Sequence, residues 1–108
     1  MINGPLPFKL SAPAALRIIR ETAQDTSRVI VTTHAKRRMK ERRISLTQII
    51  DCLFHGQINE GPSLDTHGSW VCSLSWRHAG DYMKVALAIK HEVKTGHKLI
   101  IITVMYED

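Results

Sequence analysis

Cysteine is scarce in this sequence. Cys52 and Cys72 are the two that it contains. They are isolated, at positions that suit the interior of a helix and of a strand, so we expect two buried thiols and no disulfide. His, Cys and acidic residues form no cluster with metal-like spacing, so we expect no metal site and no cofactor.

Membrane and secretion signals are also missing. No apolar run approaches the roughly 20 residues that a helix needs to span a bilayer. Residues 1–5 lack the charged and apolar regions of a signal peptide. There are no repeats, low-complexity segments or linkers, and 108 residues are enough for one hydrophobic core. We therefore expect a cytoplasmic protein with a single domain, 1–108, and no membrane association.

Acidic residues are rare in one short segment. Six of the 15 Lys and Arg residues lie between Lys36 and Arg43, where Glu41 is the one acid. Without those eight residues the chain has nine basic and nine acidic side chains, so the whole net charge of +5 lies in this segment. Concentrated positive charge favours a polyanion as the partner.

The basic segment contains no Gly or Pro, which suits a helix. With a step of about 100° per residue, His34, Arg38 and Arg42 fall on one stripe of that helix. Ala35 and Met39 form a narrow apolar stripe beside it. A helix with one stripe for the core and one titratable, cationic stripe suits a site for an anion or for RNA phosphates.

Hydrophobic periodicity predicts helices in the first half of the chain and strands in the second. The expected helices are 12–24, the basic helix that ends near 43, and one that runs from 46 to a stop at Gly56. Ser45 and Gln48 form a capping box before the third helix. The expected strands are 28–32, a short strand around 58 that ends at 61–62, 70–78, 82–90 and 99–106.

This element order, α-β-α-α-β-β-β-β, predicts an α+β domain. We expect the helices to pack on one face of a curled antiparallel sheet. The last strand is apolar on both of its faces, which favours a central position in the sheet. Residues 1–27 would form a lead-in and helix, and 28–106 the core of the domain.

Three blocks of sequence resemble a known family. They are His34-Ala35-x-x-Arg38-Met39-x-x-Arg42-x-Ile44-Ser45, Gly56-x-Ile58-x-Glu60-Gly61 and Ile101-Ile102-Thr103-Val104. They are similar to the signature of domain-of-unknown-function family 4258, over about 29–106. That family resembles the RelE/ParE-like toxin superfamily in its order of elements. The resemblance implies a small ribonuclease fold, or a relative that kept the fold and binds RNA or protein without cutting.

A ribonuclease that uses the ribose 2′-hydroxyl needs an acid, a base and cations around the phosphate. His34 would be the acid or base, and Arg38 and Arg42 would hold the phosphate. Tyr106 is a weaker candidate for a second proton carrier. Structural alternatives stay open for His34, as a simple cap of the helix start, and for Tyr106, as a strand aromatic.

The other basic side chains of the segment also have two interpretations. Lys36, Arg37, Lys40 and Arg43 form a track for RNA phosphates or a solvated helix face. Arg38 is either a phosphate ligand or a structural partner of Glu60 or Glu107. The six phosphate-binding candidates are Lys36, Arg37, Arg38, Lys40, Arg42 and Arg43.

The aromatic residues favour structure over binding. Trp70 and Trp76 alternate with Cys72 and Leu74, which indicates core positions more strongly than base-stacking positions. The leading hypothesis is an RNA-binding domain, with metal-independent ribonuclease activity left open and the ribosome as one setting for it. The alternative is a non-catalytic module of a toxin–antitoxin-like system whose basic helix docks an acidic antitoxin. The oligomeric state stays open.

Overall fold

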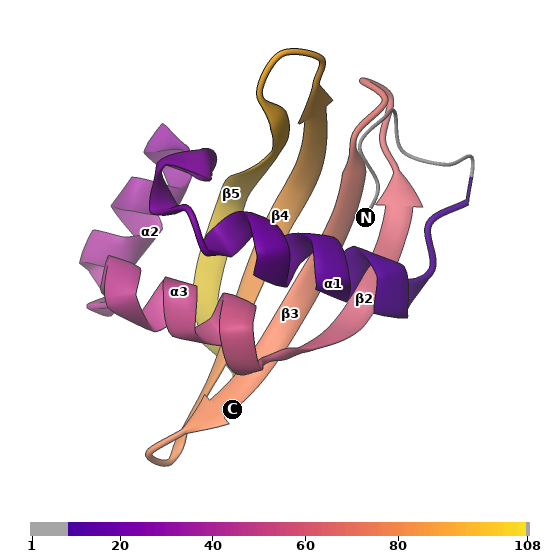
Figure 1. Ribbon diagram of the computed structural model, residues 1–108. Helices are drawn as coiled ribbons and strands as arrows, with labels where there is room; N and C mark the ends of the chain where they lie inside the picture. Colours follow the sequence, from indigo (N-terminus) through magenta and orange to yellow (C-terminus); the bar gives the residue numbers. More distant parts are fainter. Residues whose placement is uncertain (1–8, 108) are drawn as a thin grey trace.

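The structure, a computed structural model that describes residues 9–107, is an α+β domain with three α-helices and a five-stranded sheet (Figure 1). This confirms the predicted fold class. The elements are α1 (Ala12–Ala23), a short 3-10 helix (Thr26–Arg28), β1 (Val29–Val31), α2 (Thr33–Arg42), α3 (Leu46–His55), β2 (Gln57–Leu64), β3 (Trp70–His78), β4 (Asp81–Glu92) and β5 (Gly96–Glu107).

The sheet is mixed, and the prediction of an antiparallel sheet was wrong in one pair of strands. Its order is β1-β5-β4-β3-β2. β1 runs parallel to β5, with Val29 opposite Leu99 and Val31 opposite Ile101, whereas the other pairs are antiparallel. The prediction failed because periodicity shows that a segment is a strand but not which strand it pairs with. β4 is the middle strand, so β5 is internal without being central.

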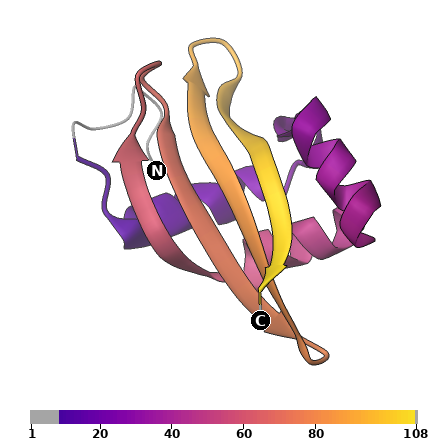
Figure 2. The same cartoon turned by 180° about the vertical axis from the view of Figure 1, so that it is seen from behind.

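Helices cover one face of the sheet. α1 and α3 pack together and lie across it, and α2 packs against β5 (Figure 1). The view from behind shows no helix over the opposite face among the described residues (Figure 2). Side chains of β4 that point toward the helices alternate along the strand and are buried: Met83, Val85, Leu87 and Ile89. Their spacing of two is the pattern that predicted this strand.

Strand β2 extends beyond its predicted end. The sequence placed the end at Gly61-Pro62, but the strand continues to Leu64. Its register with β3 shifts between Ile58 and Glu60 and again between Glu60 and Ser63. Proline has no N–H to donate to a neighbouring strand. It is tolerated in β2 because β2 is an edge strand, with no neighbour on its outer side.

Each helix begins at a side chain that caps it. The Ser11 hydroxyl accepts from Ala14 N at 3.2 Å, and Thr32 Oγ1 accepts from Ala35 N at 3.1 Å. The capping box of α3 is confirmed, because Ser45 Oγ accepts from Gln48 N and Gln48 Oε1 accepts from Ser45 N. These caps satisfy N–H groups that have no partner inside the helix.

The two cysteines are buried and free, as expected. Cys52 lies in α3 and Cys72 in β3. Burial raises the pKa of each thiol to about 12. The thiols are therefore protonated and unreactive at neutral pH. No helix among residues 9–107 is long and apolar enough to cross a membrane.

A histidine pair lies at the far end of β4 and β5. His91 and His97 lie opposite each other, with ring centroids 5.2 Å apart. Burial first, and then the neighbouring His91, lower the pKa of His97 below its usual 6.5; Glu21 acts in the opposite direction, and Arg28 lowers the pKa further. Within residues 9–107, the buried Nδ1 of His91 and Nε2 of His97 have no hydrogen-bond partner.

We expect the free energy of unfolding to fall as the pH drops below about 6.5. Below this pH the unfolded chain binds a proton at His97, whereas the folded chain, in which the pKa of His97 is lower, does not. The free energy of unfolding therefore rises with pH between the folded and the unfolded pKa of His97, and it levels off below the folded pKa. Urea unfolding at several pH values measures the slope. His97→Gln should reduce it, whereas His67→Gln, at an exposed hairpin, should leave it unchanged. Equal slopes in wild type and His97→Gln would contradict this prediction.

Candidate nucleic-acid interface

Helix α2 is held to the sheet by its start and by one apolar stripe. Thr32 caps the helix and also donates from Oγ1 to the carbonyl of Ile101 on β5 at 2.9 Å. Ala35 is fully buried and Met39 packs against the core. The predicted apolar stripe is therefore confirmed. The remaining positions of α2 are free to face solvent.

The basic residues of this segment form what we call the cationic surface: Lys36, Arg37, Arg38, Lys40, Arg42 and Arg43. Five of these side chains are exposed, and Arg38 is half-buried. Arg38 pairs with Glu41 at 3.1 Å, one turn further along the helix. None of the other five has an ion-pair partner among residues 9–107. The surface therefore presents positive charge that the described part of the protein does not neutralise.

The structural alternative for Arg38, a pairing with Glu60 or Glu107, is not formed. Both carboxylates pair with Lys84 of β4 instead, Glu107 at 3.6 Å. Lys84 lies between the two acids because of the strand order. Glu107 is on β5, on one side of β4, and Glu60 is on β2, which lies beyond β3 on the other side. Sequence separation gave no indication of this arrangement.

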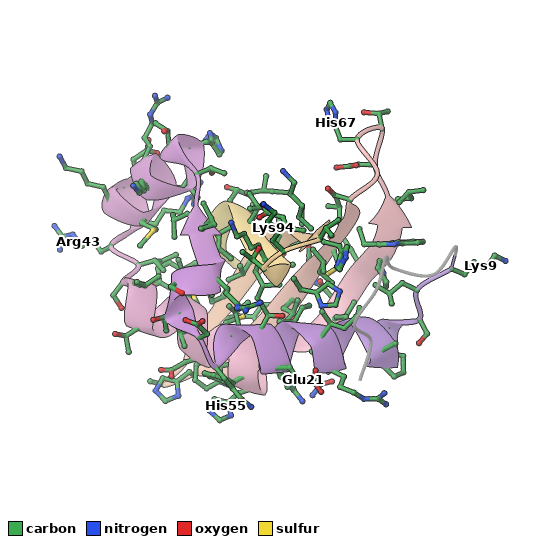
Figure 3. The ribbon with its side chains drawn as sticks, turned by 45° about the horizontal axis from the view of Figure 1, so that its top comes forward. Lys9, Glu21, Arg43, His55, His67 and Lys94 are labelled. Carbon is green, nitrogen blue, oxygen red and sulfur yellow. The ribbon has the colours of Figure 1, made fainter. Side chains whose placement is uncertain are left out.

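The cationic surface continues past the end of α2. Arg43 follows the last helical residue and has a left-handed backbone, with φ of 57° and ψ of 45°. Its N–H bonds to the carbonyl of Met39, which ends the helix. Its side chain extends away from the body of the protein, at the corner between α2 and α3 (Figure 3). A non-glycine residue in this conformation costs about 1 kcal/mol.

His34 does not cap the helix. Thr32 is the cap, and His34 is the second helical residue and is exposed. It precedes Arg38 by four residues, so both belong to one stripe of α2, with Arg42 one turn further. The structure thus keeps the predicted stripe of one histidine and two arginines on a single helix.

Tyr106 lies apart from the start of α2. Thr32 bonds to Ile101, whereas Tyr106 is five residues further along β5, or about 16 Å in an extended strand. The tyrosine hydroxyl accepts instead from Gln48 Nε2 of α3 at 3.3 Å. Tyr106 therefore belongs with α3 and not with His34.

A second cluster surrounds Tyr106 and was not predicted. It is a pocket of about 110 Å³, which we call the end pocket. Its main lining comes from α3, β3, β4 and β5: Gln48, Asp51, Trp76, His78, Met83 and Tyr106. Ala79 and Asp81, around the β3–β4 turn, complete it.

Strand pairing puts three of these side chains in a row. Trp76 lies opposite Met83, and Met83 lies opposite Tyr106. The indole of Trp76 stacks with His78, with centroids 4.7 Å apart and planes at 22°. His55, from the end of α3, contacts the same indole at 5.2 Å. Trp70 is a core residue with 7% exposure, as predicted, whereas Trp76 is only partly buried.

The family model called "Domain of unknown function (DUF4258)" matches residues 31–106. The chain belongs to the DUF4258 family. No curated protein and no solved structure matches it. The matched range contains the cationic surface and the end pocket, and it omits α1.

The sequence of this DUF4258 domain indicates its end-pocket residues only weakly. Alternation placed Trp76 on the core-facing side of its strand, and the short gap between the predicted strands 70–78 and 82–90 suits the hairpin that the structure contains. Neither feature indicated that α3 would bring Gln48 and Asp51 to the same place. No group of three His, Cys, Asp or Glu side chains suited to a metal occurs in the described range.

Proposed function

We propose that this DUF4258 domain binds RNA through the cationic surface of α2 and has a RelE/ParE-like fold. The observation that carries the proposal is the unneutralised charge: six basic residues in eight positions, with Arg38–Glu41 as the one ion pair within residues 9–107 that involves any of them. Phosphates are bound by exposed Lys and Arg side chains in this way. The order β1-α2-α3-β2-β3-β4-β5 supports the fold assignment.

The chemistry of α2 favours RNA over an acidic protein. Protein interfaces generally contain aromatic or large apolar anchors near their centre. The large hydrophobic residues exposed in residues 9–107 are Ile30, Leu46, Leu64, Val93 and Ile102, and none belongs to 33–43. A surface of charge alone suits a phosphate backbone. An acidic antitoxin is the outcome that the test must exclude.

Metal-independent cleavage is a separate hypothesis for the same helix. His34 would transfer the proton, and Arg38 and Arg42 would stabilise the phosphate charge. The exposed position of His34 on their stripe supports this part of the hypothesis. Tyr106 is far from the start of the helix, so its role as second proton carrier has less support.

The test is a titration of labelled single-stranded RNA at several salt concentrations. If four or five basic side chains contact phosphates, log K should fall with log salt at a slope of about −3. Polyglutamate of similar length is the competitor, and it should displace RNA poorly. A denaturing gel of the same mixtures reports cleavage by wild type and His34→Ala. Absence of binding at low salt, or stronger binding of polyglutamate than of RNA, would refute the proposal.

A further inference from the structure

The end pocket has two aromatic side chains in its lining, Trp76 and Tyr106. Trp76 and Tyr106 stand on either side of Met83 on the face of the sheet that α3 covers. Neighbouring strands are about 4.8 Å apart, so the backbones of Trp76 and Tyr106 are about 10 Å apart. Aromatic side chains at this spacing can hold a ring between them, and single-stranded bases bind proteins by such stacking.

Two histidines pack against the Trp76 indole of the end pocket. His78 lies against the Trp76 indole at a small interplanar angle, and His55 contacts the same indole from the end of α3. Tyr106 is fixed by its hydrogen bond from Gln48. Walls that are ordered before binding lower the entropy lost when a ligand enters.

Two carboxylates, Asp51 and Asp81, stand out among the polar groups of the pocket. Gln48 Oε1 is used by the N–H of Ser45, and its Nε2 donates to Tyr106. Asp51 and Asp81 have no ion-pair partner among residues 9–107, and no Lys or Arg lines the pocket. Two carboxylates without an ion pair disfavour a phosphate and favour a ligand that offers N–H donors.

Guanine is the base that matches a carboxylate best. Its N1–H and N2–H₂ groups are adjacent donors, so one carboxylate can accept from both, as it does from a guanidinium fork. Asp51, half-buried on α3, is suited to this role. Uracil offers one N–H between two carbonyl oxygens, and these oxygens would face the carboxylate.

The pocket is close to the cationic surface along the chain. Gln48 follows Arg43 by five residues, and the hydrogen bond of 2.8 Å from Ser45 N to Gln48 Oε1 closes the corner between α2 and α3. Figure 1 shows α2 and α3 meeting at this corner beside the sheet. A strand whose phosphates follow α2 can therefore place a base in the pocket.

We propose that the end pocket is a nucleobase site that prefers guanine, held between Trp76 and Tyr106 and read by Asp51. The proposal rests on RNA binding by α2 for the source of the base, and it extends that function to sequence preference. A free guanine nucleoside shares the same chemistry, so the test separates the two sources.

The first arm uses guanosine and uridine, which carry no phosphate and do not depend on α2. In the folded Trp70→Phe variant, Trp76 is the one remaining tryptophan and reports binding by fluorescence. We expect saturable binding of guanosine and about tenfold weaker binding of uridine, a difference of about 1.4 kcal/mol. Asp51→Asn should remove that preference. Glu21→Gln, which changes an exposed carboxylate on α1, should leave it intact.

The second arm uses uridine-rich RNA oligonucleotides with and without guanosines. If the pocket holds an RNA base, the guanosine-containing RNA should bind about tenfold more tightly, and Asp51→Asn should abolish the difference without changing the salt slope. Salt-dependent RNA binding without guanosine binding would overturn the pocket and leave the function of α2 intact. Guanosine binding without RNA binding would support the base site, as one for free nucleosides, and overturn the function of α2. Equal affinity for guanosine and uridine would also overturn the proposal.

Discussion

Replacement of Lys36, Arg37, Lys40 and Arg43 by glutamine in one variant should weaken RNA binding by on the order of 100-fold at moderate salt. These four side chains are exposed and have no ion-pair partner within residues 9–107. A phosphate that the protein no longer neutralises keeps its counterion, so the salt slope should fall toward zero together with the affinity. Fluorescence anisotropy with labelled RNA measures both quantities.

The helix should survive this change. Glutamine is nearly as good a helix former as lysine and arginine, and the change leaves untouched the side chains that hold α2 to the sheet. Those side chains are Thr32, Ala35 and Met39. Circular dichroism and urea unfolding check the fold. A decrease in RNA affinity without a decrease in stability then assigns the effect to charge.

The control removes the same number of charges elsewhere. Arg17, Arg77, Lys90 and Lys94 are exposed and lie on α1, β3, β4 and the β4–β5 turn. Their replacement by glutamine lowers the formal net charge of +5 by the same four units. We expect a small, general decrease in RNA affinity. If both variants bind RNA equally weakly, net charge and not the cationic surface is responsible.

Local features could be predicted from this sequence, and features that depend on distant segments could not. The capping box at Ser45 and Gln48, the stripe of Ala35 and Met39 on α2, and the alternation along β4 all lie within a few residues. Their physical causes are a side chain that reaches its own helix end and a fixed angular step. These predictions were confirmed in the structure.

The pairing of β1 was left undetermined by the sequence. The parallel neighbour of β1 is a strand that begins 65 residues after β1 ends, from Val31 to Gly96. The lining of the end pocket comes from three strands and from α3. Four separate segments must therefore come together before the pocket forms. Arg38 is a different case, because its partner Glu41 is three residues further along its own helix, a local pair that helix spacing predicts.

Gly56→Ala should strongly destabilise the domain, with a loss of about 3 kcal/mol in the free energy of unfolding. The sequence pattern indicated that Gly56 is a helix stop, and it does follow α3. Its φ of −72°, however, is open to any residue, so a left-handed turn is not the reason for the glycine.

The reason is the close approach of two backbones. A Cβ at position 56 would lie 2.6 Å from the carbonyl oxygen of Cys52 and 2.9 Å from that of Ser75. Both atoms belong to regular elements, α3 and β3, which must separate to make room. The Arg20 guanidinium, which donates to the carbonyl of Gly56 at 2.7 Å, would move with them. Urea unfolding measures the loss of stability, and the midpoint should fall without a change in slope.

Gly68→Ala is the matched control because it separates steric clash from backbone strain. Gly68 has φ of +80° and no atom within 4 Å of an added Cβ, so alanine there meets strain alone. That strain should cost about 1 kcal/mol, roughly one third of the loss at Gly56. A larger loss at Gly68 than at Gly56 would show that α3 and β3 can separate easily. The end pocket, which these two elements line together, would then be a flexible site instead of a fixed one.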